Sequence, residues 1–243
     1  MIIRRAFASE QSRLNRGSHL EWHGLALRHI VPLRDLSRAW SSPGCAYDVE
    51  NEGRMEIETR ELEPGLWPEL EQLFGANGAC GGCWCMSWRR QPGDDWQKDK
   101  GEVNKARLMK LVTEGKAHGI LAFSAGKPVG WCSFDRRVDY FRLNRAPSLR
   151  CGDADLVWSV PCFFVHKDFR GQGVSTALLR HALMAMKALG ASIAEGYPVK
   201  PFKSGEKTPA AFAWTGTRSL FAKQGFVVVG NPDGGKQRVR KYL

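Results

Sequence analysis

The stretch FFVHKDFRGQGVSTALL, residues Phe163–Leu179, decides the fold that the rest of the sequence must fit. An apolar run typical of a buried strand leads into a charged turn, two spaced glycines and the start of a helical pattern. The first N–H groups of a helix lack partners within the helix and carry a partial positive charge, so an anion is favoured there. The order of strand, glycine loop and helix therefore predicts a phosphate-binding site at the helix N-terminus.

The loop itself has the residue types that such a site needs. Gly171 and Gly173 lack a Cβ, so a ligand can approach the backbone closely. Arg170 adds a permanent positive charge and a fork of hydrogen-bond donors.

Two segments resemble motifs of a known family. Arg170–Ser175, RGQGVS, is similar to the pyrophosphate-binding signature Q/R-x-x-G-x-G/A of the GNAT N-acetyltransferase superfamily, with Ser175 at the last small residue. Leu220–Phe226, LFAKQGF, resembles the family's late helix, which ends in Gly-Phe. The similarity spans about Glu56 to Leu243, and the strand–loop–helix context makes it more specific than the short glycine motif alone.

The resemblance implies a cosubstrate and a fold. Acetyl-CoA would bind by its pyrophosphate at the loop and by its pantetheine arm along the preceding strand. The residues expected to contact it are Phe164, Val165, Arg170, Gly171, Gln172, Gly173, Val174 and Ser175. The implied α/β fold is a mixed, mostly antiparallel sheet of about six to seven strands, flanked by helices and splayed at its fourth and fifth strands.

Alternation and helical spacing along the chain agree with this fold. Strands are expected at Glu56–Glu61, Gly119–Phe123, Val129–Phe134, Leu156–Val165, Ser192–Tyr197, Phe226–Val229 and Gln237–Tyr242. Helices are expected at Pro64–Phe74, Lys98–Glu114 and Arg218–Gln224, and after the loop with an apolar face of Leu178, Ala182, Ala185, Met186 and Leu189. Arg136–Arg150 is interpreted as a loop with at most one helical turn. Pro161 interrupts the central strand, which predicts a bulge and a slot beside it.

Residues 1–54 differ from the rest of the chain. They hold eight arginines and no lysine, and their apolar residues show no sustained period. We interpret them as a poorly ordered extension, with a true start at Met55 as an open alternative, and residues 55–243 as the N-acetyltransferase domain.

Composition limits the function classes. No apolar run approaches the ~20 residues of a membrane helix. The net charge of +11 suits a phosphate-bearing cofactor, and the absence of a nucleic-acid motif argues against nucleic acid as a partner. Seven cysteines, an odd number without a signal-peptide pattern, predict a cytoplasmic protein with mostly reduced thiols.

Cys80, Cys83 and Cys85 form the most conspicuous cluster. A zinc site usually takes four ligands, and only three cysteines are local, so packing as small hydrophobic residues is the favoured interpretation. Thiol sensitivity and metal binding stay open. Trp84 and Trp88 follow, and ordinary core packing is the favoured interpretation for them. In the resembled family this segment borders the acceptor cleft, so the alternative is a cleft wall that, with Arg89 and Arg90, would suit a flat or acidic acceptor.

Acetyl transfer to an amine needs a base for the amine and an acid for the departing thiolate. Glu195 is the candidate base, with an acceptor anchor or a surface carboxylate as alternatives. Tyr197 shares its strand face and is the candidate acid. At the position where many family members carry a tyrosine, this chain has Phe221, and Trp214 replaces a common asparagine, which leaves the proton transfers in doubt.

The leading prediction is an acetyl-CoA-dependent N-acetyltransferase that acts on a primary amine of a small molecule or protein by direct attack. A non-catalytic acyl-CoA sensor and a thiol or zinc regulatory module are the alternatives. The acceptor is not identified by the sequence, and a homodimer is left open.

Overall fold

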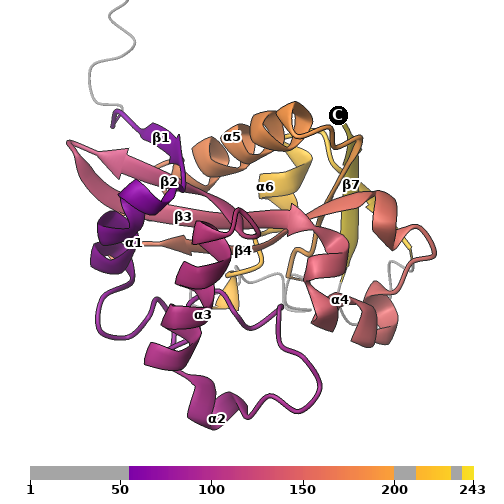
Figure 1. The fold of residues 1–243 in the computed structure, drawn as a ribbon. Helices are drawn as coiled ribbons and strands as arrows, with labels where there is room; N and C mark the ends of the chain where they lie inside the picture. Colours follow the sequence, from indigo (N-terminus) through magenta and orange to yellow (C-terminus); the bar gives the residue numbers. More distant parts are fainter. Residues whose placement is uncertain (1–54, 200–211, 231–236) are drawn as a thin grey trace, which may run out of the picture. The chain divides into compact units, whose positions relative to one another are not determined.

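A computed structural model describes residues 55–199, 212–230 and 237–243 (Figure 1). The extension expected at residues 1–54 lies outside the described residues, as does most of the loop expected at 198–209.

The described part is built on a seven-stranded sheet with the order β1-β2-β3-β4-β5-β7-β6. The strands are β1 Glu58–Glu61, β2 His118–Ser124, β3 Lys127–Arg136, β4 Val157–Val165, β5 Ile193–Gly196, β6 Val227–Val229 and β7 Arg238–Tyr242. All neighbouring pairs are antiparallel except β4 and β5. The predicted mixed, mostly antiparallel sheet is confirmed.

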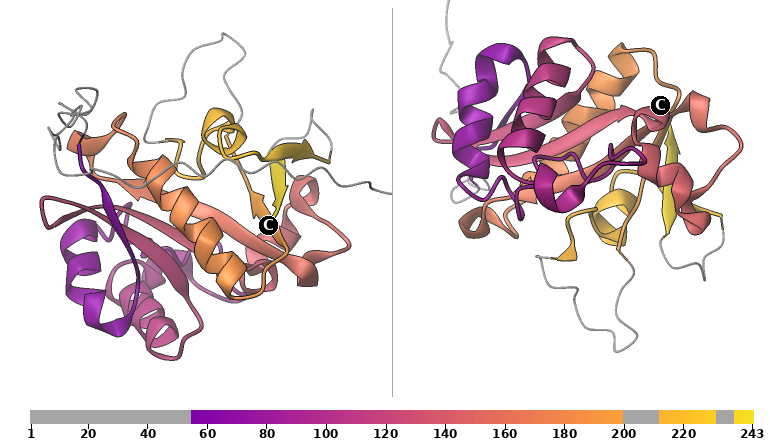
Figure 2. Two further views of the ribbon diagram at one scale, coloured as in Figure 1. Left: turned by 90° about the horizontal axis from the view of Figure 1, so that it is seen from above. Right: turned by 60° about the horizontal axis from the view of Figure 1, so that its bottom comes forward.

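Helices cover both faces of this sheet (Figure 2). They are α1 Trp67–Phe74, α2 Trp96–Asp99, α3 Glu102–Thr113, α4 Phe141–Arg145, α5 Val174–Ala188 and α6 Arg218–Ala222. α5 and α6 pack on one face and α1 and α3 on the other, each over its own apolar core.

β2 shows how its sequence specifies a strand buried on both faces. Ile120 and Ala122 belong to the core under α5, and Leu121 and Phe123 belong to the core under α1 and α3. Successive side chains of a strand point to opposite faces, so a continuous apolar run is needed where both faces are covered. The two-residue turn from β2 to β3, at Ala125 and Gly126, has positive φ at both residues, which matches the twist of a tight hairpin.

The splay between β4 and β5 is present. β4 pairs with β5 only from Val157 to Val160, although its other edge stays paired with β3 as far as Val165. Between the pairs Ser159–Asp135 and Cys162–Ser133, β4 has one residue more than β3. Pro161 lies in this bulge, where its missing N–H removes no ladder bond. The last residues of β4 therefore have one edge without a strand partner.

Three sequence expectations need correction. The helix expected at 98–114 is two helices, α2 and α3, because Gly101 between them has φ of +78°. The segment 136–150 is more helical than expected, since it contains α4 and two 3-10 turns. Leu189 does not join the buried face of α5: it is 48% exposed at the C-cap, before Gly190 with φ of +84°.

In the part of the chain that the structure describes, no helix combines the length and apolar character of a membrane span.

Candidate functional site

The loop between β4 and α5 is open to a ligand at both of its glycines. Gly171 and Gly173 have φ of +77° and +88°, and Gly173 is the N-cap of α5. A Cβ built on either glycine meets no other heavy atom within 4 Å. The backbone N–H groups of Val174 and Ser175 have no hydrogen-bond acceptor among the described residues. Free donors at a helix N-terminus suit a phosphate.

The two polar side chains of the loop behave differently. Arg170 donates from Nε to the carbonyl of Val165 at 3.1 Å, which fixes its stem against the end of β4. Gln172 turns back into the loop and donates from Nε2 to the carbonyl of Asp168 at 2.8 Å.

A cavity of about 810 Å³ extends from this loop along the unpaired edge of β4. Seven of the eight residues expected at the cosubstrate site line it, and Gln172 does not. Its other lining residues are Ala79, Cys80, Cys83, Cys85, Ser87, Trp96, Cys162, Phe163, Phe169, Thr176, Ala213, Trp214, Thr217, Ser219, Leu220 and Lys223. The volume lies within the range of about 300–1,000 Å³ typical of ligand sites.

Four cysteines from two distant segments meet at this cavity, a convergence that the sequence analysis did not find. Cys80, Cys83 and Cys85 come from the loop after α1, and Cys162 comes from β4 directly after Pro161. The sequence shows the local cluster, but nothing in its spacing brings Cys162 to it. No group of three or more histidine, cysteine or acidic side chains in the described residues has the geometry of a metal site.

Cys85 and Cys162 form a close pair. Their sulfurs lie 3.6 Å apart, and Trp131 donates from Nε1 to the sulfur of Cys85 at 2.9 Å. The contact with Cys162 lowers the pKa of Cys85, and the Trp131 hydrogen bond acts in the same direction, against the effect of burial. The same thiol contact, together with burial, raises the pKa of Cys162 well above its usual value. Burial raises the pKa of Cys83 to about 12.

The two tryptophans after the cysteine cluster, Trp84 and Trp88, differ in their surroundings. Trp84 is a core residue, stacked on Trp67 with ring centroids 5.9 Å apart. Trp88 lies at the splay, where its Nε1 donates to the carbonyl of Pro161 at 3.1 Å. Arg89 is buried in an ion pair with Asp135 and does not line the cavity.

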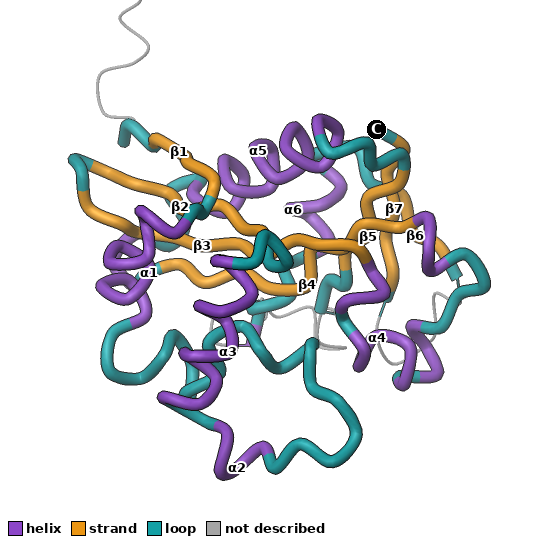
Figure 3. Tube along the Cα trace, viewed as in Figure 1, coloured by secondary structure: helices purple, strands orange, loops and turns teal. Residues whose placement is uncertain are grey.

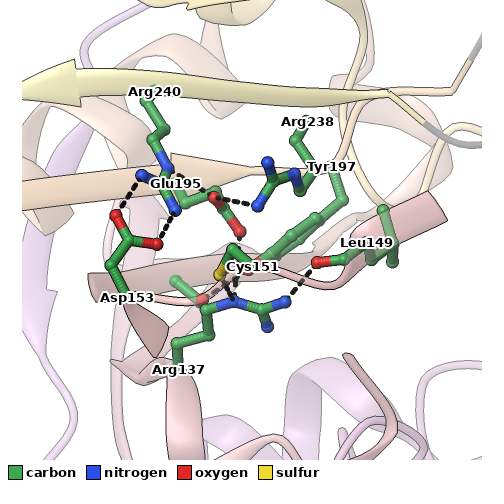
Figure 4. A network of polar contacts seen from close by, with 9 residues as sticks. Arg137, Leu149, Cys151, Asp153, Glu195, Tyr197, Arg238 and Arg240 are labelled. Carbon is green, nitrogen blue, oxygen red and sulfur yellow. Dashed lines mark hydrogen bonds and ion pairs between the residues drawn. The ribbon is translucent and has the colours of Figure 1, made fainter. Parts of the chain in front are cut away.

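Glu195 lies in a buried ionic network (Figure 4). Its Oε2 accepts from Nε of Arg240 at 2.6 Å and lies 3.5 Å from Nη1 of Arg238, and its Oε1 lies 3.4 Å from Nε of Arg137. Arg240 also binds both carboxylate oxygens of Asp153, at 2.6 and 2.9 Å. Three guanidinium groups therefore surround this carboxylate, and Asp153 shares one of them.

Tyr197 is completely buried beside this network. Its hydroxyl lies 2.6 Å from Oγ of Ser159, and burial, followed by the charge of Glu195, raises its pKa well above the usual value. Neither Tyr197 nor Glu195 lines the cavity. Both side chains are buried away from the cavity, and their expected roles of acid and base stay predictions.

A second cavity of about 390 Å³ lies beside the splay. Its lining residues are Trp88, Arg90, Gln91, Arg142, Arg145 and Ala146. Trp88 connects it to the first cavity, because its ring lies 5.6 Å from that of Trp214. Arg142 makes a further connection, since it donates to the carbonyl and the hydroxyl of Ser87, which lines the first cavity.

A helix-mouth loop, a splayed strand pair and a cavity joining them define a site for an extended phosphate-bearing ligand. Residues 82–196, which include the loop, the splayed strand pair and most residues that line the cavity, match the acetyltransferase (GNAT) family. The chain thus contains a GNAT acetyltransferase domain and is an acyltransferase, which confirms the resemblance found in its sequence.

Comparison with curated protein sequences finds no match. Among solved structures, PaiA N-acetyltransferase from Thermoplasma acidophilum in complex with coenzyme A is 16% identical, with 78% of this chain and 100% of that chain covered and a TM-score of 0.47. A GCN5-related N-acetyltransferase from Kribbella flavida is 18% identical, with 77% and 98% covered and a TM-score of 0.46. The yncA protein from Salmonella typhimurium, solved with its cofactor acetyl-CoA, is 13% identical, with 77% and 94% covered and a TM-score of 0.45.

Proposed function

We propose that this protein is an acetyl-CoA-dependent N-acetyltransferase that acetylates a primary amine of a small molecule or protein by direct attack. The observation that carries the proposal is the cavity of about 810 Å³ between the α5 N-terminus and the unpaired edge of β4. Along the length of the cavity, the lining changes from groups that suit a pyrophosphate to groups that suit a pantetheine arm, which is the order of these parts in acetyl-CoA.

The loop end of the cavity suits the pyrophosphate. The free N–H groups of Val174 and Ser175 are donors at a positively charged helix end, and Arg170 supplies a full charge. Gly171 and Gly173 leave space for the phosphates because no Cβ projects there.

The middle of the cavity suits the pantetheine arm. Phe164 and Val165 line it beside a strand edge that β5 leaves unpaired. On this edge the N–H of Phe163 donates to the carbonyl of Trp214 at 2.7 Å, and the carbonyl of Val165 accepts from Arg170. The remaining N–H and C=O groups of an unpaired strand edge can bind an extended partner with amide groups. The thioester would then lie toward Cys162 and Pro161, where the two strands separate.

A non-catalytic acyl-CoA sensor is the second candidate. Phe221, at the position of the family's tyrosine, is completely buried against Gly196 and Phe163 and carries no proton. No carboxylate, imidazole or phenol lines the cavity in the described part of the chain.

Two measurements distinguish these candidates. Calorimetric titration with CoA tests the binding site, and both candidates predict a single site. Release of free CoA thiol from acetyl-CoA with a panel of amines tests turnover, which only the transferase predicts. Absence of CoA binding would overturn the proposal.

A further inference from the structure

We propose that Cys85 and Cys162 form the acid–base pair of the transfer reaction. This inference rests on the proposed function and adds the residues that move the protons. One proton must leave the amine nitrogen and one must reach the CoA sulfur, and thiols are the groups at the cavity that can do both.

Elimination among the described lining residues leads to the thiols. Besides the cysteines, the ionisable side chains at the cavity are Arg170 and Lys223, which are cations suited to phosphates. Burial keeps Cys83 protonated, with a pKa of about 12. Of the remaining thiols at the cavity, Cys80 is exposed to solvent, whereas Cys85 and Cys162 contact each other.

The pair is built to hold one proton between two sulfurs. The Trp131 N–H donates to the sulfur of Cys85, and when Cys85 is a thiolate the Cys162 thiol, 3.6 Å away, can donate to it as well. A free cysteine has a pKa of about 8.5, near that of other alkyl thiols. The contact with Cys85 is the largest cause of the raised pKa of Cys162, so this pKa falls once the Cys85 thiolate takes up the amine proton, and transfer from Cys162 to the CoA sulfur becomes less unfavourable. General acids and bases work best when their pKa lies near the operating pH.

The charged and titratable groups around Cys85 agree with a thiolate there. They are Cys83 and Arg89 on its own loop, Cys132 on β3, Cys162 on β4, and Tyr140 before α4. Arg89 favours the thiolate, although its ion pair with Asp135 moderates the effect. Burial raises the pKa of Cys132 and of Tyr140, so both stay neutral.

The proton steps balance. As the amine nitrogen bonds to the acetyl carbon, its proton passes to the Cys85 thiolate. As the carbon–sulfur bond of the thioester breaks, the Cys162 thiol gives its proton to the CoA sulfur. The new Cys85 thiol then returns a proton to the Cys162 thiolate across the 3.6 Å contact, which restores the pair.

The first test needs no substrate. The ultraviolet absorbance of thiolate is followed against pH in the reduced protein. We expect one thiolate to titrate below the usual cysteine range, to disappear in Cys85→Ser and to shift to higher pH in Cys162→Ala, which removes a donor. Cys132→Ala is the matched control, because it removes a buried thiol that holds no thiolate. A wild-type titration without a low-pKa thiolate would overturn the proposal.

The second test uses turnover with acetyl-CoA and an accepted amine. Cys85→Ser should lower kcat by about 10²–10⁴-fold with CoA affinity unchanged. Cys162→Ala should move the acidic limb of the kcat/KM profile to higher pH. If Cys85→Ser does not fold, as judged by melting, Trp131→Phe removes the other donor and should shift the same limb.

Two results contradict the pair while leaving the transferase intact. Wild-type rates and pH profiles in the cysteine variants would exclude it. Stable acetylation of Cys85 or Cys162 by acetyl-CoA without amine, seen by intact mass, would replace it with a covalent route. Failure of the wild-type protein to bind CoA or turn over would instead contradict the proposed function.

The second cavity carries an independent inference, which also rests on the proposed function. The geometry points to a site for an anionic group of the acceptor, a carboxylate or a phosphate. Arg90, Arg142 and Arg145 line one cavity, and none of them forms an ion pair with a carboxylate of the described residues. Other arginines of the chain, such as Arg107 and Arg240, do pair with carboxylates.

Two of these guanidinium groups lie over aromatic rings. Arg90 lies over Trp96 at 4.8 Å from the ring centroid, and its Nε is buried without a hydrogen-bond partner among the described residues. Arg142 lies over Trp88 at 5.8 Å. Burial and then the charges of Arg90 and Arg145 lower the pKa of Arg142, so an anion would relieve the repulsion. Stacked guanidinium forks suit both carboxylate and phosphate.

The test is calorimetry on protein saturated with CoA, which occupies the other phosphate site. Inorganic phosphate and glutarate are the two probes, and they separate the phosphate and carboxylate sources. Arg145→Gln should weaken binding of the preferred probe by about tenfold or more, with CoA affinity unchanged. Lys110→Gln on α3, an exposed cation away from the cavity, should have no effect. Absence of binding by both probes, or equal binding in Arg145→Gln, would overturn the inference.

Discussion

Replacing Glu195 by glutamine tests whether the role of its carboxylate is structural or catalytic. The change keeps the side-chain volume and the oxygen facing Arg240, and removes the charge. Glu195 is completely buried, and three arginines lie within 3.5 Å of its carboxylate. In Glu195→Gln the guanidinium groups of Arg137 and Arg238 lose their closest anion.

Removing one partner of a buried ion pair costs roughly 3–5 kcal/mol. Glutamine still accepts a hydrogen bond, and Asp153 still pairs with Arg240, so the lower limit, about 3 kcal/mol, is expected. For a domain of this size, that destabilisation lowers Tm by about 6–12 °C.

Thermal melting by circular dichroism measures this shift, and Glu114→Gln is the matched control. Glu114 pairs with Lys110 and Lys116 at the surface, so its loss should leave Tm unchanged within error. At temperatures where Glu195→Gln stays folded, its kcat and pH profile should equal those of the wild type. An unchanged Tm together with a kcat loss of about 100-fold or more would refute the reasoning and restore Glu195 as a base.

Further predictions address the same region and the chain's ends. Tyr197→Phe should lose about 1 kcal/mol through the bond to Ser159, with kcat unchanged, as measured by melting and kinetics; a tenfold kcat loss would contradict this. The hydrogen bonds from Arg240 hold the pKa of Asp153 below its unfolded value. The Asp153 carboxylate therefore stabilises the fold above about pH 4, and this stabilisation is lost as the pH falls further. Acid unfolding of Asp153→Asn, compared with the wild type, measures the effect. A chain beginning at Met55 should melt within a few degrees of the full chain, and insolubility of that chain would contradict our interpretation of residues 1–54.

Local patterns made the fold predictable. The apolar run of β2 and the Pro161 break in β4 each encode their own structure, because burial and a missing N–H act on neighbouring residues. The glycine loop likewise carries its conformation in Gly171 and Gly173. Gly101 lies inside the single helix expected at 98–114, although its positive φ divides α2 from α3.

The site could be predicted only where it is local. Glu195 is expected to face substrate on the basis of strand alternation alone. Alternation predicts the face of the sheet on which a side chain lies, but not the residues that cover that face. Arg137 and Arg240 cover it from 58 and 45 residues away in the sequence. Cys162 reaches Cys85 across 77 residues, a contact that depends on how β4 passes the loop after α1. Such pairings follow from tertiary packing and have no signal in one sequence.

Acetyl transfer at the loop between β4 and α5 is tested most directly by release of CoA thiol with an amine panel, measured for the wild type, Gly173→Ala and Gly173→Glu. Both variants place a Cβ at a residue with φ of +88°, so they share the backbone strain, and only Gly173→Glu adds a negative charge where the pyrophosphate is proposed to lie. We predict turnover by the wild type, a modest loss of CoA affinity in Gly173→Ala, and no CoA binding or turnover in a folded Gly173→Glu. Equal CoA affinity in all three proteins, or no thiol release by the wild type with any amine, would contradict the account.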